Sequence, residues 1–177
     1  MTRSRSSAIV WMLFVFSLLV AGNESQAQGP KGRSFGFGFS LGEPTAVTLR
    51  FWESRMNSWD AAIGVSHLGN PHIHADYLWH FPDAFNSRVV SLYAGVGAVV
   101  GFGERGKYIW NRGKKWDDDY WWLEDGDLLI AAKGAFGLDI IPKNSAVEIF
   151  LELNPVLGIV PGFGFDFQGA IGVRFYP

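Results

Sequence analysis

The 177-residue chain contains eight Trp, five Tyr, fifteen Phe and 22 Gly but no Cys, and 18% of its residues are charged. Low charge with many aromatic residues excludes a mostly disordered chain, and the lack of cysteine excludes disulfides, thiolate catalysis, zinc-thiolate sites and attachment as a bacterial lipoprotein. Fifteen basic residues against seventeen acidic ones give no charge excess that would favour nucleic acid.

Residues 1–27 have the layout of a secretory signal peptide. A basic start is followed by an apolar run at residues 8–21 and by small residues near the end. We predict cleavage after Ala27, which leaves one domain over residues 28–177 with 13 basic and 16 acidic residues. An uncleaved anchor helix is the alternative, but the run is shorter than the ~20 apolar residues that a membrane-spanning helix needs.

The C-terminal stretch shows a period of two most clearly. Its large apolar residues share one parity, namely Phe163, Phe165, Phe167, Ile171, Val173 and Phe175. The other parity carries small or polar residues. Because a helix would scatter these phenylalanines around its circumference, the pattern predicts a strand with one very apolar face.

The same alternation recurs upstream and predicts eight strands. They are expected at residues 35–41, 47–52, 59–66, 72–81, 90–98, 128–139, 147–154 and 163–175. Turn-forming residues separate them at 42–44, 53–57, 67–71, 82–88, 142–145 and 155–162. The connection from Gly101 to Asp127 differs, because its 27 residues far exceed what a hairpin needs.

The two strand faces differ in a way that predicts which one points outward. One is bulky and nearly free of charge, whereas the other is small, with scattered ions. Too few ions are present for a solvated surface, but they suit a narrow lumen, so the bulky face is expected to meet lipid in an eight-stranded, antiparallel, up-and-down transmembrane barrel. The predicted polar network in the lumen comprises Arg50, Asp60, His74, Asp76, Lys133, Glu148, Glu152 and Arg174. The alternative is a soluble periplasmic barrel with reversed faces that binds an apolar ligand inside.

Aromatic residues near the strand ends predict a girdle at the lipid–water boundary. These residues are Trp52, Trp59, Trp79, Phe81 and Phe85. With the N-terminus in the periplasm, the connection at 101–127 falls outside the cell, as expected for short periplasmic turns and longer external loops.

The signal peptide, the eight alternating strands and the last strand ending at Tyr176 resemble the small bacterial outer-membrane barrels of the OmpA membrane-domain and OmpX type. The resemblance implies a location in the outer membrane of a Gram-negative-type bacterium, no channel of useful width, and a final aromatic residue read by the assembly machinery. Here Pro177 follows that aromatic residue. Outer-membrane lipid is the expected environment, and we predict a monomer with no cofactor.

His72, His74 and Asp76 alternate along one predicted strand and therefore share a face. Two histidines spaced by two can reach one metal ion, and an aspartate can be a third ligand or orient a ring. The competing interpretation places them in the ion-paired lumen network, since buried ions need partners. No second ligand cluster with site spacing accompanies them, so no metal site is predicted.

A lipid-modifying enzyme, an acyl hydrolase or transferase, is a further alternative. Ser66, His67 and His72 lie near the expected outer rim and offer a nucleophile and a base. Ser66 and His67 are neighbours, however, and so point to opposite faces of a strand. The expected role is therefore non-enzymatic.

The long connection has a basic first half and an acidic second half, which suggests a hairpin that extends the two flanking strands beyond the membrane. It also carries the aromatic residues Tyr108, Trp110, Trp116, Tyr120, Trp121 and Trp122. Exposed Trp and Tyr beside charge suit a surface for an extracellular protein or ligand. The alternative is that they form the external girdle. We expect a structural or surface-interaction role through this loop.

Overall fold

The computed structural model describes residues 29–103, 107–110, 120–123 and 127–177. In the described part of the chain, one 3-10 turn, η1 (Pro30–Gly32), precedes the strands. The strands are β1 (Phe35–Gly42), β2 (Thr45–Trp52), β3 (Asn57–Ser66), β4 (Gly69–Phe81), β5 (Val90–Phe102), β6 (Lys107–Trp110), β7 (Tyr120–Leu123), β8 (Leu128–Ile140), β9 (Val147–Val160) and β10 (Gly164–Phe175). Within these described ranges, no helix is long and apolar enough to cross a membrane.

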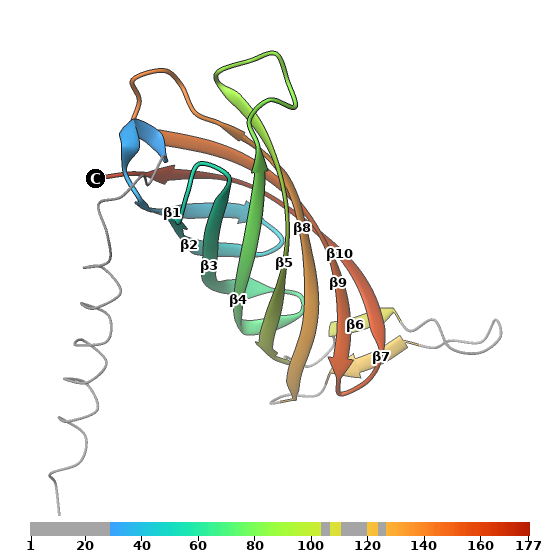
Figure 1. Cartoon of the computed structure of the whole chain (residues 1–177). Helices are drawn as coiled ribbons and strands as arrows, with labels where there is room; N and C mark the ends of the chain where they lie inside the picture. The colour runs from blue at the N-terminus through green and yellow to red at the C-terminus, as the bar shows by residue number, and fades with distance from the viewer. Residues whose placement is uncertain (1–28, 104–106, 111–119, 124–126) are drawn as a thin grey trace, which may run out of the picture.

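Eight of these strands form a closed antiparallel barrel (Figure 1). Each pairs with the next in the order β1-β2-β3-β4-β5-β8-β9-β10, and β10 closes the sheet by pairing with β1. The closing ladder runs from Phe37 opposite Phe175 to Gly42 opposite Ala170. Closure leaves no free edge along these residues, because both strands then have partners on both sides. The predicted fold class is confirmed.

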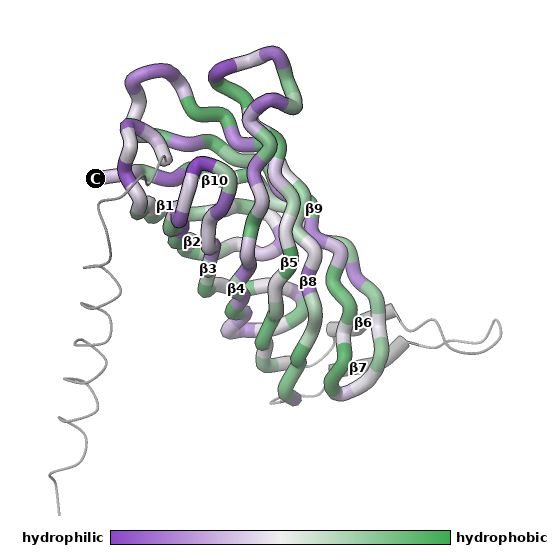
Figure 2. Tube along the Cα trace, viewed as in Figure 1, coloured by the Kyte–Doolittle hydropathy of each residue, from purple (hydrophilic) through white to green (hydrophobic). Residues whose placement is uncertain are grey.

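The bulky apolar face points outward. Side chains such as Phe39, Val96 and Phe167 are 54%, 58% and 58% exposed. On the intervening positions Arg50 is 0% and Arg174 is 2% exposed, because those side chains fill the lumen. Hydropathy accordingly alternates along the strands in Figure 2. The predicted faces are confirmed, and the reversed arrangement of a soluble barrel with an apolar interior is wrong.

Three predicted boundaries are wrong, because in each case the strand is longer than expected. The turn expected at 155–162 lies at 161–163, since β9 runs to Val160. Pro155 is accommodated inside β9 by Gly134 of β8, where an added Cβ would lie 3.0 Å from the proline ring. β4 likewise begins before Pro71, and β5 continues through Phe102 into the expected loop.

The barrel has two different ends. We call the end with η1 and the C-terminus the terminal end, and the opposite one, with the 103–127 connection, the loop end (Figure 1). Two-residue turns join β1 to β2 and β3 to β4 at the loop end, whereas residues 82–89 join β4 to β5 at the terminal end. The expected length rule therefore holds for the 103–127 connection but not for every turn.

The wall of the barrel is lower on the side of β1 and β2. These strands have 8 residues each, against 13 in β4, β5 and β8. At about 3.4 Å per residue, the longer strands reach roughly 17 Å further. The β1 ladder stops opposite Ala170, so the loop end of β10 extends beyond it.

The expected girdle is formed in part. Trp59, Trp79, Phe81 and Phe85 are exposed near the strand ends, as predicted. The prediction for Trp52 is wrong, because its side chain lies on the inward face of β2 and is only 4% exposed. Its indole Nε1 donates a hydrogen bond to the Tyr176 hydroxyl at 3.0 Å inside the terminal end.

Candidate functional site

Two arginines and three carboxylates form a closed network in the terminal half of the lumen. We call this set, Arg50, Arg174, Asp60, Asp139 and Glu148, the arginine cluster. Arg50 lies 2.8 Å from Asp60, 2.9 Å from Asp139 and 2.9 Å from Glu148. Arg174 lies 2.5 Å from Asp60 and 2.6 Å from Glu148. Asp60 and Glu148 thus bridge both arginines, whereas Asp139 contacts Arg50 alone among them.

Aromatic and hydroxyl groups complete the surroundings of the arginine cluster. The Arg174 guanidinium lies 3.7 Å from the centre of the Phe150 ring, and its Nε donates to the Thr48 hydroxyl at 3.1 Å. Tyr176 donates a hydrogen bond to Glu148. The Phe150 ring and the Thr48 and Tyr176 hydroxyls thus add contacts to charged groups of the arginine cluster. Buried ions need such additional contacts to offset the loss of water.

A second network, the lysine cluster of Lys133, Asp76 and Glu152, lies further toward the loop end. Lys133 Nζ is 2.6 Å from Asp76 and 3.2 Å from Glu152. The Tyr93 hydroxyl donates to Glu152 at 2.8 Å. Gly137 stands opposite Tyr93 in the ladder, and a Cβ there would lie 2.3 Å from the Tyr93 hydroxyl. The glycine therefore makes room for the ring.

The two clusters supply the positive charges for a pair of aspartates on neighbouring strands. Asp60 of β3 and Asp76 of β4 stand directly opposite each other in the ladder. Like charges in that position are destabilising. The arginines neutralise Asp60 and Lys133 neutralises Asp76, so the two clusters divide the pair between them.

Beyond the lysine cluster, toward the loop end, the lumen contains polar side chains whose hydrogen bonding is incomplete among the described residues. His72 and His74 lie with ring centres 5.6 Å apart. Among the described residues, neither ring nitrogen of His72 has a hydrogen-bond partner, and nor does the side-chain amide of Asn154. Asn154 faces Gln168 across the β9–β10 ladder, and Gln168 donates to Ser66 Oγ at 3.0 Å.

The positions of His72, His74 and Asp76 do not support the metal alternative. His74 Nε2 is 3.6 Å from Asp76 Oδ2, and the same oxygen is held by Lys133. In the part of the chain that the structure describes, no group of three or more His, Cys, Asp or Glu is placed to hold a metal ion. Asp76 is a partner of the lysine, which the sequence pattern of that strand did not reveal.

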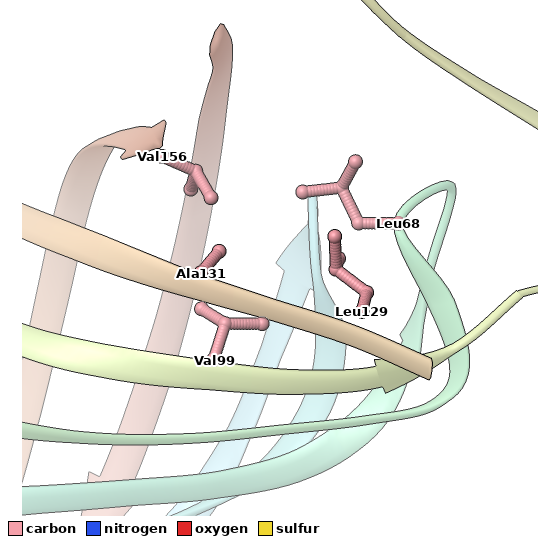
Figure 3. Packing of buried hydrophobic residues seen from close by; sticks show 5 residues of the cluster. All are labelled: Leu68, Val99, Leu129, Ala131 and Val156. Carbon is pink, nitrogen blue, oxygen red and sulfur yellow. The ribbon is translucent and has the colours of Figure 1, made fainter. Parts of the chain in front are cut away.

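An apolar cluster lies in the lumen toward the loop end (Figure 3). Leu68, Val99, Leu129, Ala131 and Val156 are each 0% or 1% exposed and form one cluster. Leu68 enters it from the β3–β4 turn, whereas the others project from β5, β8 and β9. The lumen thus changes along its length, with ion pairs in the middle and toward the terminal end, and uncharged polar side chains beside an apolar cluster toward the loop end.

His67 joins three segments at the rim of the loop end. Its Nδ1 lies 3.0 Å from Glu43 of the β1–β2 turn, and its Nε2 lies 2.9 Å from Asp166 of β10. The hydrogen bond to Asp166 and the charges of both carboxylates outweigh burial and raise the pKa of His67. For Glu43, burial acts to raise the pKa, but hydrogen bonds from Ser66 and His67 outweigh it and lower the pKa overall.

The His67 contacts predict a pH-dependent stability at the loop end. A raised pKa in the folded state stabilises the barrel below the unfolded pKa of about 6.5, and this contribution is lost as the pH rises through the folded pKa. Because His67 is 35% exposed, we expect a loss below about 1 kcal/mol between pH 6 and pH 9.

Urea unfolding of wild type and His67→Gln at pH 6 and pH 9 measures this effect. The wild-type midpoint should fall with rising pH, and the variant should lose that component of the fall. An identical pH dependence in both proteins would contradict the assignment.

The aromatic loop residues fall partly within the described ranges. β6 and β7 pair as a hairpin in which Tyr108 stands opposite Trp122, Ile109 opposite Trp121, and Trp110 opposite Tyr120. The hairpin was expected, but its position is different. It is attached to β10 through the pair Phe165 and Trp110, where the wall next to β1 is low, and β6 does not pair with β5. Trp116 lies outside the described residues.

Comparison with known proteins gives a likeness of fold. No family model and no curated protein matches the chain. Among solved structures, the chain is similar to the N-terminal β-barrel domain of Pseudomonas aeruginosa OprF. The TM-score is 0.50 at 12% sequence identity, and the match covers 80% of this chain and 94% of that domain. The architectural resemblance to small barrels of the OmpA type is therefore confirmed.

Proposed function

We propose that the chain is a small, monomeric outer-membrane barrel, exported by cleavage after Ala27, with a non-enzymatic role in envelope structure or surface interaction. One observation carries this proposal, the combination of a hydrocarbon exterior with an ion-paired interior. Exposed apolar side chains cover every barrel strand from β1 to β10, while both charge clusters lie in the lumen. Such an exterior is stable in lipid and would be an aggregation hazard in water.

The 103–127 connection supports the surface-interaction part of the proposal. In the proposed orientation it lies outside the cell, where the three neighbouring turns are short. We therefore assign the proposed contact to the aromatic residues of β6 and β7, which belong to this connection. Tyr and Trp are the residue types that dominate binding interfaces.

The His67 contacts argue against His67 as the base of a lipid-modifying enzyme. A base for Ser66 needs a ring nitrogen free to accept the hydroxyl proton. Both nitrogens of His67 are within 3.0 Å of a carboxylate oxygen. An unchanged lipid A profile in a deletion strain would agree with the non-enzymatic proposal, and an altered profile that Ser66→Ala fails to restore would favour the enzyme.

Cell fractionation and gel migration test the membrane location. We expect the protein in the outer-membrane fraction, with different migration in a detergent gel before and after boiling, because a closed barrel resists detergent at room temperature. The processed protein should begin at Gln28 in N-terminal sequencing. Recovery from the periplasmic fluid without detergent would overturn the proposal.

Removal of the long loop tests the surface role separately. Replacing residues 104–125 by a short Gly-Ser linker should leave heat-modifiable migration intact, because the eight-stranded ladder does not include them. Retention of expressing cells on surfaces coated with extracellular protein should fall. A full-length control with Tyr108, Trp110, Tyr120, Trp121 and Trp122 changed to Ser separates aromatic contacts from loop length. Equal retention for wild type and the deletion would contradict a role for the loop.

A further inference from the structure

The terminal end holds a cavity that none of the lumen clusters occupies. It has a volume of about 520 Å³, which lies in the range of small-molecule sites. Trp52 and His80, whose rings lie 4.1 Å apart, line it from the lumen side. η1 and the connections between β2 and β3, β4 and β5, and β8 and β9 line the rest. These segments gather at one end of the barrel in Figure 1, and Figure 2 colours parts of the long β4–β5 and β8–β9 connections as hydrophilic.

The charge of the cavity lining is strongly one-sided. Four separate segments each contribute one basic residue, namely Lys31 of η1, Arg55 after β2, Arg88 before β5 and Lys143 after β8. Asp83 is the single acidic residue among those that line the cavity. The part of the chain after Ala27 has 13 basic and 16 acidic residues, so this concentration of positive charge runs against the overall balance. Like charges gathered around a concave site focus the field on an anion inside it.

The backbone adds an independent observation at the same place. Lys31 and Asn144 have φ of 58° and 57°, and they are the two residues other than glycine with positive φ in the described part of the chain. Both line this cavity. Asn adopts the left-handed region readily, but left-handed backbone at a lysine is uncommon, and such strained residues concentrate at binding sites.

We propose that this cavity, the basic mouth, binds a small anion that carries two or more carboxylate or phosphate groups. Arg55 and Arg88 offer planar guanidinium donors, which match both groups in a bidentate manner. Lys31 and Lys143 offer point charges, and Asn144 adds an amide donor. The volume admits a compact polyanion, and several cations from different segments favour multiple negative groups over a single one. Under the function proposed above, the basic mouth faces the periplasm.

Calorimetric titration of the full, detergent-folded barrel tests this proposal. Inorganic pyrophosphate and a tricarboxylate serve as probes, with acetate as the monovalent comparison. We expect pyrophosphate and the tricarboxylate to bind more tightly than acetate, and their affinity to fall as NaCl is raised, because exposed charges are screened. The double variant Arg55→Gln/Arg88→Gln should bind on the order of tenfold more weakly. Asp83→Asn should bind about twofold more tightly, since it removes the one repulsive charge.

A matched control and a lipid comparison complete the experiment. Lys107→Gln removes one positive charge on β6, at the loop end, and should leave the affinity unchanged. In bilayers of phosphatidylcholine the probes should still bind, and competition by added cardiolipin, whose headgroup carries two phosphates, would identify a lipid headgroup as the source of the anion. Lack of competition would identify a free anion. Equal affinity in wild type and the double variant, or an equal loss in Lys107→Gln, would overturn the proposal. Heat-modifiable migration of each variant shows that the barrel itself is intact, so that failure here is distinct from failure of the membrane location.

Discussion

Arg50→Met is expected to lower the free energy of unfolding by about 3–5 kcal/mol, because removal of one partner leaves buried charge uncompensated. The effect is specific to the pairing pattern. Asp60 and Glu148 keep Arg174 as a partner, whereas Asp139 loses its only arginine within the arginine cluster. Among the described residues, the ion pair left to Asp139 is with His80 Nδ1 at 3.1 Å. The cost of the substitution should therefore arise mainly at Asp139.

The pairing pattern gives an order of effects that a general loss of packing would not. Arg174→Met should cost less than Arg50→Met, since each carboxylate it contacts also contacts Arg50. The double variant Arg50→Met/Asp139→Asn should be more stable than the sum of the single effects predicts, because the orphaned charge is gone. Urea unfolding in detergent or vesicles, followed by gel migration, measures these differences. Unchanged midpoints for both Arg50→Met and Glu148→Gln would refute the network.

Parity along the strands predicted most of the lumen. Every residue of the predicted network is buried, including Lys133 at 2% and Glu148 at 0% exposure. This succeeds because a strand assigns every second side chain to one face, whatever its partners are. Parity also placed Asp139, Tyr93 and His80 inward, although their participation was not predicted.

Which lumen side chains contact one another depends on distances between strands, and the alternation along the sequence does not give these distances. Arg50 meets Asp139 across the barrel, 89 residues away in the chain. Such contacts are fixed by the stagger between strands when the sheet closes. The same limit explains His67, whose partner Asp166 lies on β10. It also explains the hairpin of β6 and β7, whose attachment follows from the early end of β1.

The predictions of the strand ends were wrong for a more local reason. Pro155 and Pro71 are typical turn residues, yet both lie inside strands. The ladder between β8 and β9 has no paired residues where Pro155 lies opposite Gly134, with pairing resuming at Phe136. A proline is tolerated at such an interruption because no hydrogen bond from its nitrogen is required. The neighbouring strand thus decides whether the turn forms.

Leu151→Arg, inside β9 rather than at its end, is expected to lower the free energy of unfolding in a bilayer by about 2–4 kcal/mol, the cost of arginine on the lipid-facing surface of a barrel. Leu151 is 49% exposed on the outward face of β9, between Ile171 of β10 and Leu138 of β8. All three are apolar, so the new charge has no partner at that depth. A soluble barrel would respond differently, because exposed substitutions in water usually change stability by at most about 0.5 kcal/mol.

Depth provides the control for this prediction. Phe81→Arg, at the end of β4, should cost only about 0–1 kcal/mol, because arginine near the interface reaches water. Asn86→Arg, in the exposed β4–β5 connection, should have no measurable effect. Unfolding in phosphatidylcholine vesicles compares the three variants with wild type. Equal small effects at Leu151, Phe81 and Asn86 would contradict a lipid-facing surface, since only a hydrocarbon layer makes the cost of one arginine depend on its height along the barrel wall.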